Sequence, residues 1–257
     1  MASARWARPV IAGNWKMNKG PQAAREFVRE FGARYAPAGS VTVMLIPPAV
    51  SLAVVADALE GRRDIQLGIQ NIYWEVEGAF TGETSAAMAK EAGATFALIG
   101  HSERRHVFGE NDEEVRRKVA AALQSGLTPV ICVGETLDER KARKVEDVIE
   151  RQLSAAIAGL TSDQAFAFLV AYEPVWAIGT GVTATPNDAS HAQGVLRALL
   201  ERQLGNEGRE VPILYGGSVK PDNAASLLRA ENVDGLLIGG ASLDPEGFAT
   251  ICRTAAD

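Results

Sequence analysis

Eight short segments that are almost continuously apolar recur along the chain, and longer amphipathic stretches separate them. They span residues 9–12, 41–46, 65–69, 96–99, 128–133, 166–172, 213–215 and 235–238. Strands of a parallel sheet are covered on both faces, so they lack the alternation of polar and apolar residues that a half-exposed sheet shows. The pattern therefore predicts eight parallel strands, each followed by a helix.

The number of units favours a closed barrel. The chain has 257 residues, which is about 32 for each of the eight units and matches the size of a βα repeat. No spacer rich in Pro, Ser or Gly divides the sequence. We predict an α/β protein with a single domain over residues 1–257, a (β/α)8 barrel of eight parallel strands inside a ring of helices. The alternative, a doubly wound open sheet, is expected to carry a glycine-rich turn after its first strand, where this chain has Gly13-Asn14-Trp15-Lys16.

Charge and composition exclude several classes of partner. The chain carries 26 Lys plus Arg against 32 Asp plus Glu, a net charge of −6, which argues against nucleic acid and anionic membranes as partners. The longest apolar run, 165–172, is far shorter than the roughly 18 residues that span a bilayer. Cys132 and Cys252 are too few for a disulfide framework. We expect a soluble, cytoplasmic protein.

Polar residues directly after the predicted strands are the candidates for a site, because barrels of this kind build their active sites at the carboxyl ends of the strands. Glu173 follows the sixth strand, where burial would raise its pKa toward the range of a general base. His101 follows the fourth strand and opens an expected helix, whose N-terminal dipole would keep the imidazole neutral. The alternatives are a structural ion pair for Glu173 and a structural role for His101.

The first, seventh and eighth strands end in residues suited to anions. Asn14 and Lys16 offer a neutral donor and a fixed positive charge, although an isolated Lys is usually a solvated surface residue. The turns YGGSV at 215–219 and IGGAS at 238–242 follow the two strands after which barrels often bind phosphate through backbone N–H groups. One Gly-Gly pair alone usually marks only a tight turn.

An apolar segment at 174–181 lies outside the predicted helices and strands. Apolar loop residues are normally buried, so the segment is either a lid that closes over a ligand or a loop packed permanently on the rim.

Six motifs resemble one family. They are GNWKMN at 13–18, IGHSERR at 99–105, ICVGET at 131–136, AYEPVWAIGTG at 171–181, YGGSVKPDN at 215–223 and DGLLIGGASL at 234–243. Together they make nearly the whole chain similar to the triosephosphate isomerase family. The resemblance implies interconversion of dihydroxyacetone phosphate and D-glyceraldehyde 3-phosphate, a reaction of glycolysis and gluconeogenesis, without a metal or an organic cofactor.

The same resemblance implies roles for individual residues. Glu173 is expected to be the catalytic base and His101 a neutral electrophile, with Lys16 and Asn14 stabilising an enediolate and binding substrate. Glu103 is expected to support Lys16. The substrate phosphate is expected to meet backbone N–H groups of Gly179, Ser218, Gly239 and Gly240.

The stretch 70–83, QNIYWEVEGAFTGE, resembles the family's long third loop, which inserts into a partner subunit. Its Tyr73, Trp74 and Phe80 would be an unusual amount of exposed aromatic surface on a monomer. A homodimer through this loop is therefore expected, with Thr81 reaching toward the partner's site.

Two other functions compete with the isomerase. In a barrel aldolase, Lys16 would form a Schiff base, but such a Lys needs an apolar pocket and polar residues are expected around this one. A barrel that binds phosphate without catalysis is the other alternative. The presence of Glu173, His101, Lys16 and Asn14 together disfavours it.

Overall fold

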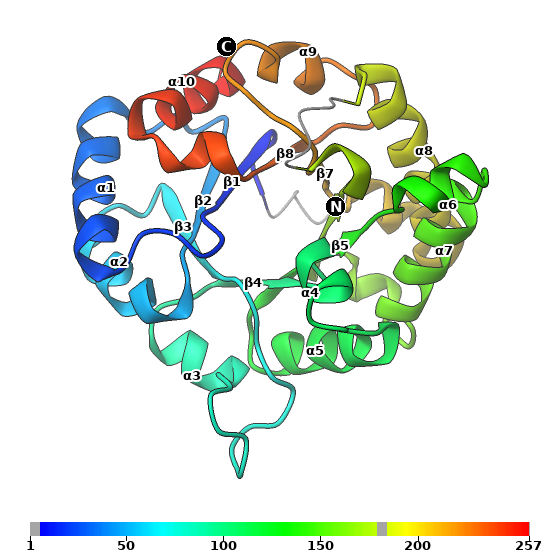
Figure 1. Cartoon of the computed structure of the whole chain (residues 1–257), viewed down its shortest axis with the longest axis horizontal. Helices are drawn as coiled ribbons and strands as arrows, with labels where there is room; N and C mark the ends of the chain where they lie inside the picture. The colour runs from blue at the N-terminus through cyan, green and yellow to red at the C-terminus, as the bar shows by residue number, and fades with distance from the viewer. Residues whose placement is uncertain (1–5, 179–183, 257) are drawn as a thin grey trace.

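A computed structural model describes residues 6–178 and 184–256. Eight parallel strands form a closed barrel in sequence order, in which β1 pairs with both β2 and β8 (Figure 1). The strands are β1 Val10–Asn14, β2 Thr42–Ile46, β3 Ile65–Ile69, β4 Phe96–Ile99, β5 Thr128–Val133, β6 Leu169–Tyr172, β7 Ile213–Tyr215 and β8 Gly235–Ile238. The predicted (β/α)8 barrel is confirmed, and the open sheet is excluded.

The helices form a ring around the barrel (Figure 1). The α-helices are α1 Pro21–Arg34, α2 Leu52–Ala58, α3 Ala86–Glu91, α4 Ser102–His106, α5 Asp112–Gln124, α6 Leu137–Lys141, α7 Val145–Ala156, α8 Pro186–Leu204, α9 Ala224–Leu228 and α10 Pro245–Ala256. Short 3-10 helices are η1 Ala49–Ser51, η2 Ser162–Ala167, η3 Val175–Ala177, η4 Gly205–Glu210 and η5 Gly240–Leu243. The described helices include none with the length and hydropathy of a transmembrane segment.

The continuous apolar character of the strands arises from two separate cores. On β2, Met44 and Ile46 belong to the cluster inside the barrel, whereas Val43 and Leu45 belong to the larger cluster between the strands and the helices. Successive side chains of a strand point to opposite faces, so both sets of positions must be apolar. Because both faces of each strand are buried, polar and apolar residues do not alternate along the strands.

Two predicted strand boundaries were wrong by two residues or more. The run 166–172 does not form one strand, because 162–167 winds into η2 and β6 begins only at Leu169. Ala165 and Phe168 are nevertheless buried, so their apolar character reflects packing outside the strand. In the other direction, β1 extends past the apolar run to Asn14, which is polar but pairs with Ile46 of β2 and is buried.

The parallel topology brings the carboxyl ends of all strands to one mouth of the barrel. Asn14 ends β1, His101 lies two residues after β4, and Glu173 directly follows β6. The loop 70–83 leaves the barrel between β3 and α3 and projects beyond the ring of helices (Figure 1). A bridge between Tyr73 and Ser85 closes its base.

Candidate active site

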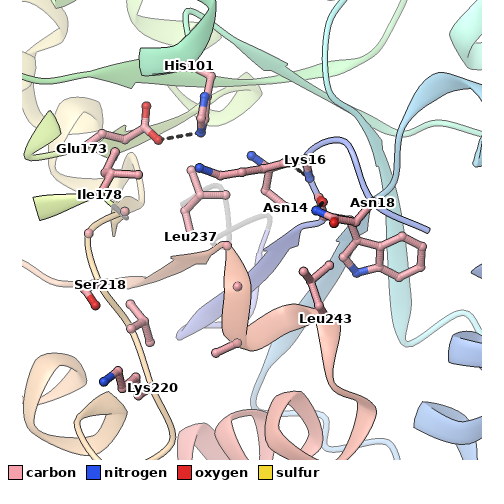
Figure 2. A pocket seen from close by; sticks show the side chains of 17 residues that line it. Asn14, Lys16, Asn18, His101, Glu173, Ile178, Ser218, Lys220, Leu237 and Leu243 are labelled. Atoms are coloured by element: carbon pink, nitrogen blue, oxygen red, sulfur yellow. Dashed lines mark hydrogen bonds and ion pairs between the residues drawn. The ribbon is translucent and has the colours of Figure 1, made fainter. Parts of the chain in front are cut away.

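One pocket of about 460 Å³ opens at the mouth of the barrel and collects most of the predicted site residues (Figure 2). Its lining includes Asn14, Lys16, His101, Glu173, Ser218, Gly239 and Gly240. These residues follow five different strands and are far apart in the sequence. The closed barrel is therefore what brings them together.

Glu173 and His101 form a buried pair in this pocket. The Nε2 of His101 lies 3.0 Å from Oε1 of Glu173 (Figure 2). The backbone N–H of Ser102 donates to Oε2 of Glu173 over 2.9 Å. The backbone N–H of Glu103 donates to Nδ1 of His101 over 3.2 Å, so Nδ1 must hold a lone pair. These contacts fit an imidazole that carries its proton on Nε2 and donates it toward the carboxylate.

The two pKa values of the pair depend on each other. Burial raises the pKa of Glu173, but attraction to His101, the hydrogen bonds from His101 and Ser102, and the charge of Lys16 outweigh it and hold that pKa below its usual value. The expectation of a raised pKa is therefore wrong for this arrangement. Burial lowers the pKa of His101, and the adjacent Glu173 carboxylate outweighs it and raises that pKa, which runs against the expectation that the helix N-terminus keeps this imidazole neutral. If Glu173 turned from His101 toward a substrate, burial would raise the carboxyl pKa and lower the imidazole pKa.

Lys16 is held in an unusual backbone conformation. Its φ of 50° lies in the left-handed region, which residues other than Gly seldom adopt. Its N–H donates to Oδ1 of Asn14 over 3.0 Å, and its carbonyl accepts from Nε2 of Gln70 over 2.9 Å. Such strain persists only where the surroundings determine the conformation. Two side chains thus fix the peptide groups on both sides of Lys16.

The ammonium of Lys16 reaches across the pocket rather than into solvent. Its Nζ lies 2.6 Å from Oε1 of Glu103. A Cβ placed on Gly239 would lie 3.4 Å from Cε of Lys16, so the stem of the side chain runs against the turn that follows β8. Only 27% of the side chain is exposed, which does not fit the alternative of a solvated surface Lys. The positive charge therefore lies between the His101 side of the pocket and the glycine turns.

Glycine turns form another wall of the pocket. Ser218 follows β7, while Gly239 follows β8 and Gly240 is the first residue of η5. The first N–H groups of a helical turn have no partners within that turn, so they are available to an anion. The hydroxyl of Ser242 donates to the Gly239 carbonyl over 2.7 Å and holds this turn in place. Gly179, the fourth predicted phosphate contact, lies outside the described residues.

Three residues of the site were assigned no role from the sequence. Ser102 contributes a backbone N–H to Glu173, Gln70 holds the Lys16 carbonyl, and Nδ2 of Asn18 donates to the Trp15 carbonyl over 2.7 Å. Every residue except Pro carries a backbone N–H, so the residue type at 102 could not identify Ser102 as a hydrogen-bond donor to Glu173. Gln70 directly follows β3 and Asn18 ends the motif GNWKMN, and these positions were the only available signal.

Thr81 is not among the residues that line the main pocket of its own chain. It is exposed on the loop 70–83. A smaller pocket of about 240 Å³ lies next to the main one, and both are lined by Asn14, Lys16 and His101. Met17 and Phe108, which are 95% and 66% exposed, lie at this smaller pocket.

Gly216→Ala is expected to displace the carboxylate of Glu173. A Cβ at this position would lie 2.9 Å from Cγ of Glu173 and 3.2 Å from the Tyr172 carbonyl oxygen, so the Glu173 side chain must shift. Because a displacement of about 1 Å at a reacting group can cost on the order of 10²-fold, kcat should fall by roughly tenfold or more. Gly194→Ala in α8 is the control, since outside its own helix the nearest described atom to its Cβ would be Asn232 Nδ2, at 3.4 Å. Equal steady-state rates for the two variants would contradict this reading of Gly216.

The sequence and the fold both match known proteins. The family model of triosephosphate isomerase matches residues 9–255. Triosephosphate isomerase of Symbiobacterium thermophilum is 48% identical over 250 residues, which cover 97% of each chain. That of Carboxydothermus hydrogenoformans is 48% identical over 247 residues, or 96% of this chain and 98% of the relative.

A crystal structure of triosephosphate isomerase from Bartonella henselae superimposes with a TM-score of 0.86 and 44% identity, over 96% of this chain and 98% of that one. Fold, length and sequence thus agree over nearly the whole chain, including the strand ends that form the pocket. The chain belongs to the triosephosphate isomerase family of enzymes.

Proposed function

We propose that the chain is one catalytic domain that interconverts dihydroxyacetone phosphate and D-glyceraldehyde 3-phosphate, with Glu173 as the general base. The observation that carries the proposal is a carboxylate that is only 2% exposed, lies in the pocket beside an imidazole and faces a lysine ammonium. A base, a neutral donor and a fixed positive charge in one pocket are the groups that a proton transfer next to a carbonyl requires.

The reaction begins when substrate displaces Glu173 from His101. The freed carboxylate removes a proton from carbon 1 of the ketose, and the oxygens of the resulting enediolate accept hydrogen bonds from His101 Nε2, Asn14 and Lys16. A proton also moves from the oxygen of carbon 1 to the oxygen of carbon 2, and Glu173 returns its proton to carbon 2, which gives the aldehyde. General acid–base catalysis contributes about 10²–10⁴ in rate, and one oxyanion donor about 2.7–4 kcal/mol. Several of these groups must therefore act together.

The phosphate of the substrate would lie against the glycine wall. Backbone N–H groups of Ser218, Gly239 and Gly240, with Gly179, would bind its oxygens, and Lys16 would add a positive charge between the phosphate and the reacting carbons. The predicted lid, whose residues 179–181 lie outside the described part of the chain, would close over this end, since Ile178 of its described part, 174–178, already lines the pocket. Closure would exclude water and protect the enediolate from loss of phosphate.

An assay of the purified chain tests the reaction directly. With dihydroxyacetone phosphate as substrate, formation of D-glyceraldehyde 3-phosphate is followed through a coupled dehydrogenase. Borohydride added in the presence of substrate separates the isomerase from the aldolase, because it traps a Schiff base on Lys16. A covalent adduct on Lys16 without isomerisation would reject the proposal. If neither isomerisation nor an adduct were observed, the remaining alternative would be a barrel that only binds phosphate.

We also propose a homodimer in which the loop 70–83 of each subunit enters the smaller pocket of the other. The loop projects from the barrel, and the exposed apolar residues Met17 and Phe108 lie at the pocket that it would cover. Large apolar side chains exposed together mark an interaction surface. In this arrangement Thr81 of one subunit approaches the smaller pocket of the other, next to the Lys16 and Arg104 that line it.

Thr81→Arg is expected to weaken this dimer. The new positive charge would meet Lys16 and Arg104 in the partner's pocket. Sedimentation at micromolar concentration should show a species of about twice 27.3 kDa for the unmodified chain and more of the 27.3 kDa species for the variant. Leu137→Arg, at a 47% exposed apolar position on α6, should leave the dimer intact. A single 27.3 kDa species for the unmodified chain would rule the dimer out.

A further inference from the structure

The segment 174–178 is anchored to the barrel through Glu135, which lies two residues after β5. Glu135 is fully buried, and its carboxylate accepts hydrogen bonds from the hydroxyl of Tyr172 over 3.0 Å and from Nε1 of Trp176 over 2.8 Å. Its backbone carbonyl accepts from the N–H of Val175 over 3.1 Å. One residue thus holds the chain immediately before and after Glu173.

Arg140 of α6 adds a second group to this anchor. Its guanidinium carbon lies 4.4 Å from the centre of the Trp176 ring, and its Nη1 lies 3.5 Å from Oε1 of Glu135. A guanidinium can stack on an indole and pair with a carboxylate at the same time, because it is planar and carries donors at its edge. The Trp176 indole is therefore held by a carboxylate at its N–H and by a cation on its face.

The same guanidinium also contacts the helix that follows the segment. Nη2 of Arg140 lies 2.5 Å from Oδ1 of Asp188. The other oxygen of Asp188 accepts from the N–H of Thr185 over 2.9 Å, and the Asp188 N–H donates to Oγ1 of Thr185, which completes the capping box of α8. The start of α8 is thereby tied to the same side chain as Trp176.

An ordinary surface ion pair would not account for this arrangement. Exposed pairs between two mobile side chains contribute little, and their loss is seldom felt elsewhere. Arg140 instead has three partners from three parts of the chain, namely Glu135, Trp176 and Asp188. Among the described residues it is the cation that pairs with the buried Glu135. It joins residues on the N-terminal side of the segment to residues on its C-terminal side.

We propose that Arg140 is a positioning residue of the isomerase, which sets the placement of the segment 174–178 over the pocket by holding Trp176 and the start of α8 in fixed relation. Arg140 is not among the residues that line the pocket, so it acts on the reaction only through this segment. The inference rests on the proposed function, because it assigns Arg140 a part in covering the substrate's phosphate.

The test replaces Arg140 by Met, which keeps an unbranched stem and removes the charge, the donors and the stack. Arg143→Met is the matched control, because Arg140, Arg143 and Asp188 line one surface pocket and Arg143 makes no ion pair with another described residue. Arg140→Lys keeps the charge without the planar stack, and it replaces the Met variant if that variant does not fold. Steady-state rates with triose phosphate and the indole N–H resonances of ¹⁵N-tryptophan-labelled protein are measured for each.

The chain has four tryptophans, so the resonance of Trp176 is identified by its loss in Trp176→Phe. We expect R140M to shift the Trp176 resonance alone and to lower kcat/KM by tenfold or more, with R140K intermediate and R143M within twofold of the unmodified chain. A Trp176 resonance that stays in place, an unchanged kcat/KM, or an equal loss in R143M would overturn the role of Arg140.

Failure of the proposed function would look different. An unmodified chain that does not isomerise triose phosphate would reject that function, and the role of Arg140 with it. An active unmodified chain with an unaffected R140M variant would reject the role of Arg140 alone.

Discussion

Glu173→Asp is expected to lower kcat by on the order of 10²-fold while the protein stays folded and still binds substrate. The substitution keeps the negative charge but withdraws the carboxylate by one methylene. A displacement of about 1 Å between reacting groups can cost this much, because the catalytic advantage of a base depends on its reach. In the structure, both oxygens of Glu173 already have fixed partners, His101 at 3.0 Å and the Ser102 N–H at 2.9 Å.

The measurement is a comparison of kcat and KM for the variant and the unmodified chain. Glu113→Asp on α5 makes the same chemical change on an exposed side chain and should leave both constants unaltered. A Glu173→Asp variant that turns over within a few-fold of the unmodified rate would show that another group is the base. A variant with raised KM and unaltered kcat would assign Glu173 to binding alone.

The fold could be predicted because its main determinant is local. The runs at 65–69 and 128–133 coincide with β3 and β5, since a strand covered on both faces is apolar at most positions. Gln66 of β3, which is half-buried, is an exception. The same rule failed at 166–168, where only Phe168 is fully buried and none of the three residues belongs to a strand. Burial fixes which residues are apolar, but it does not decide between a strand and a 3-10 turn.

The membership of the candidate site could be predicted in large part, but its electrostatics could not. Parallel strands place their carboxyl ends together, so the positions of Asn14, His101 and Glu173 in the sequence already imply that they are neighbours. The pKa of Glu173 depends instead on contact with His101 and on the Ser102 N–H, which no sequence pattern records. The left-handed backbone conformation of Lys16 could not be predicted either, because it depends on contacts that no sequence pattern records.

The second large effect is expected from Lys16→Met, which should lower kcat, raise KM and reduce kcat/KM by on the order of 10³-fold. The net charge of −6 gives the protein no general attraction for a dianionic substrate, so attraction must come from charges at the pocket. Removal of one oxyanion donor costs about 2.7–4 kcal/mol, and loss of the charge beside the phosphate adds to that. Met retains a long stem that can lie against Gly239 as the stem of Lys16 does.

Loss of Lys16 also leaves the carboxylate of Glu103 without its partner at 2.6 Å, and that alone could disturb the site. The double variant Lys16→Met with Glu103→Gln removes this complication, because it deletes both charges of the pair. We expect it to be as slow as Lys16→Met alone. Lys19→Met, three residues away, changes the net charge equally and should keep both constants.

The division of the loss between kcat and KM identifies what Lys16 does. An effect on KM alone would mean that Lys16 binds phosphate equally in the substrate complex and the transition state. A fall in kcat as well means that its charge matters more as negative charge develops on the enediolate oxygens. The side chain of Lys16 lies between Glu103 and the turn at Gly239. This position places the ammonium near both the phosphate and the developing enediolate of the substrate. Both constants should therefore change.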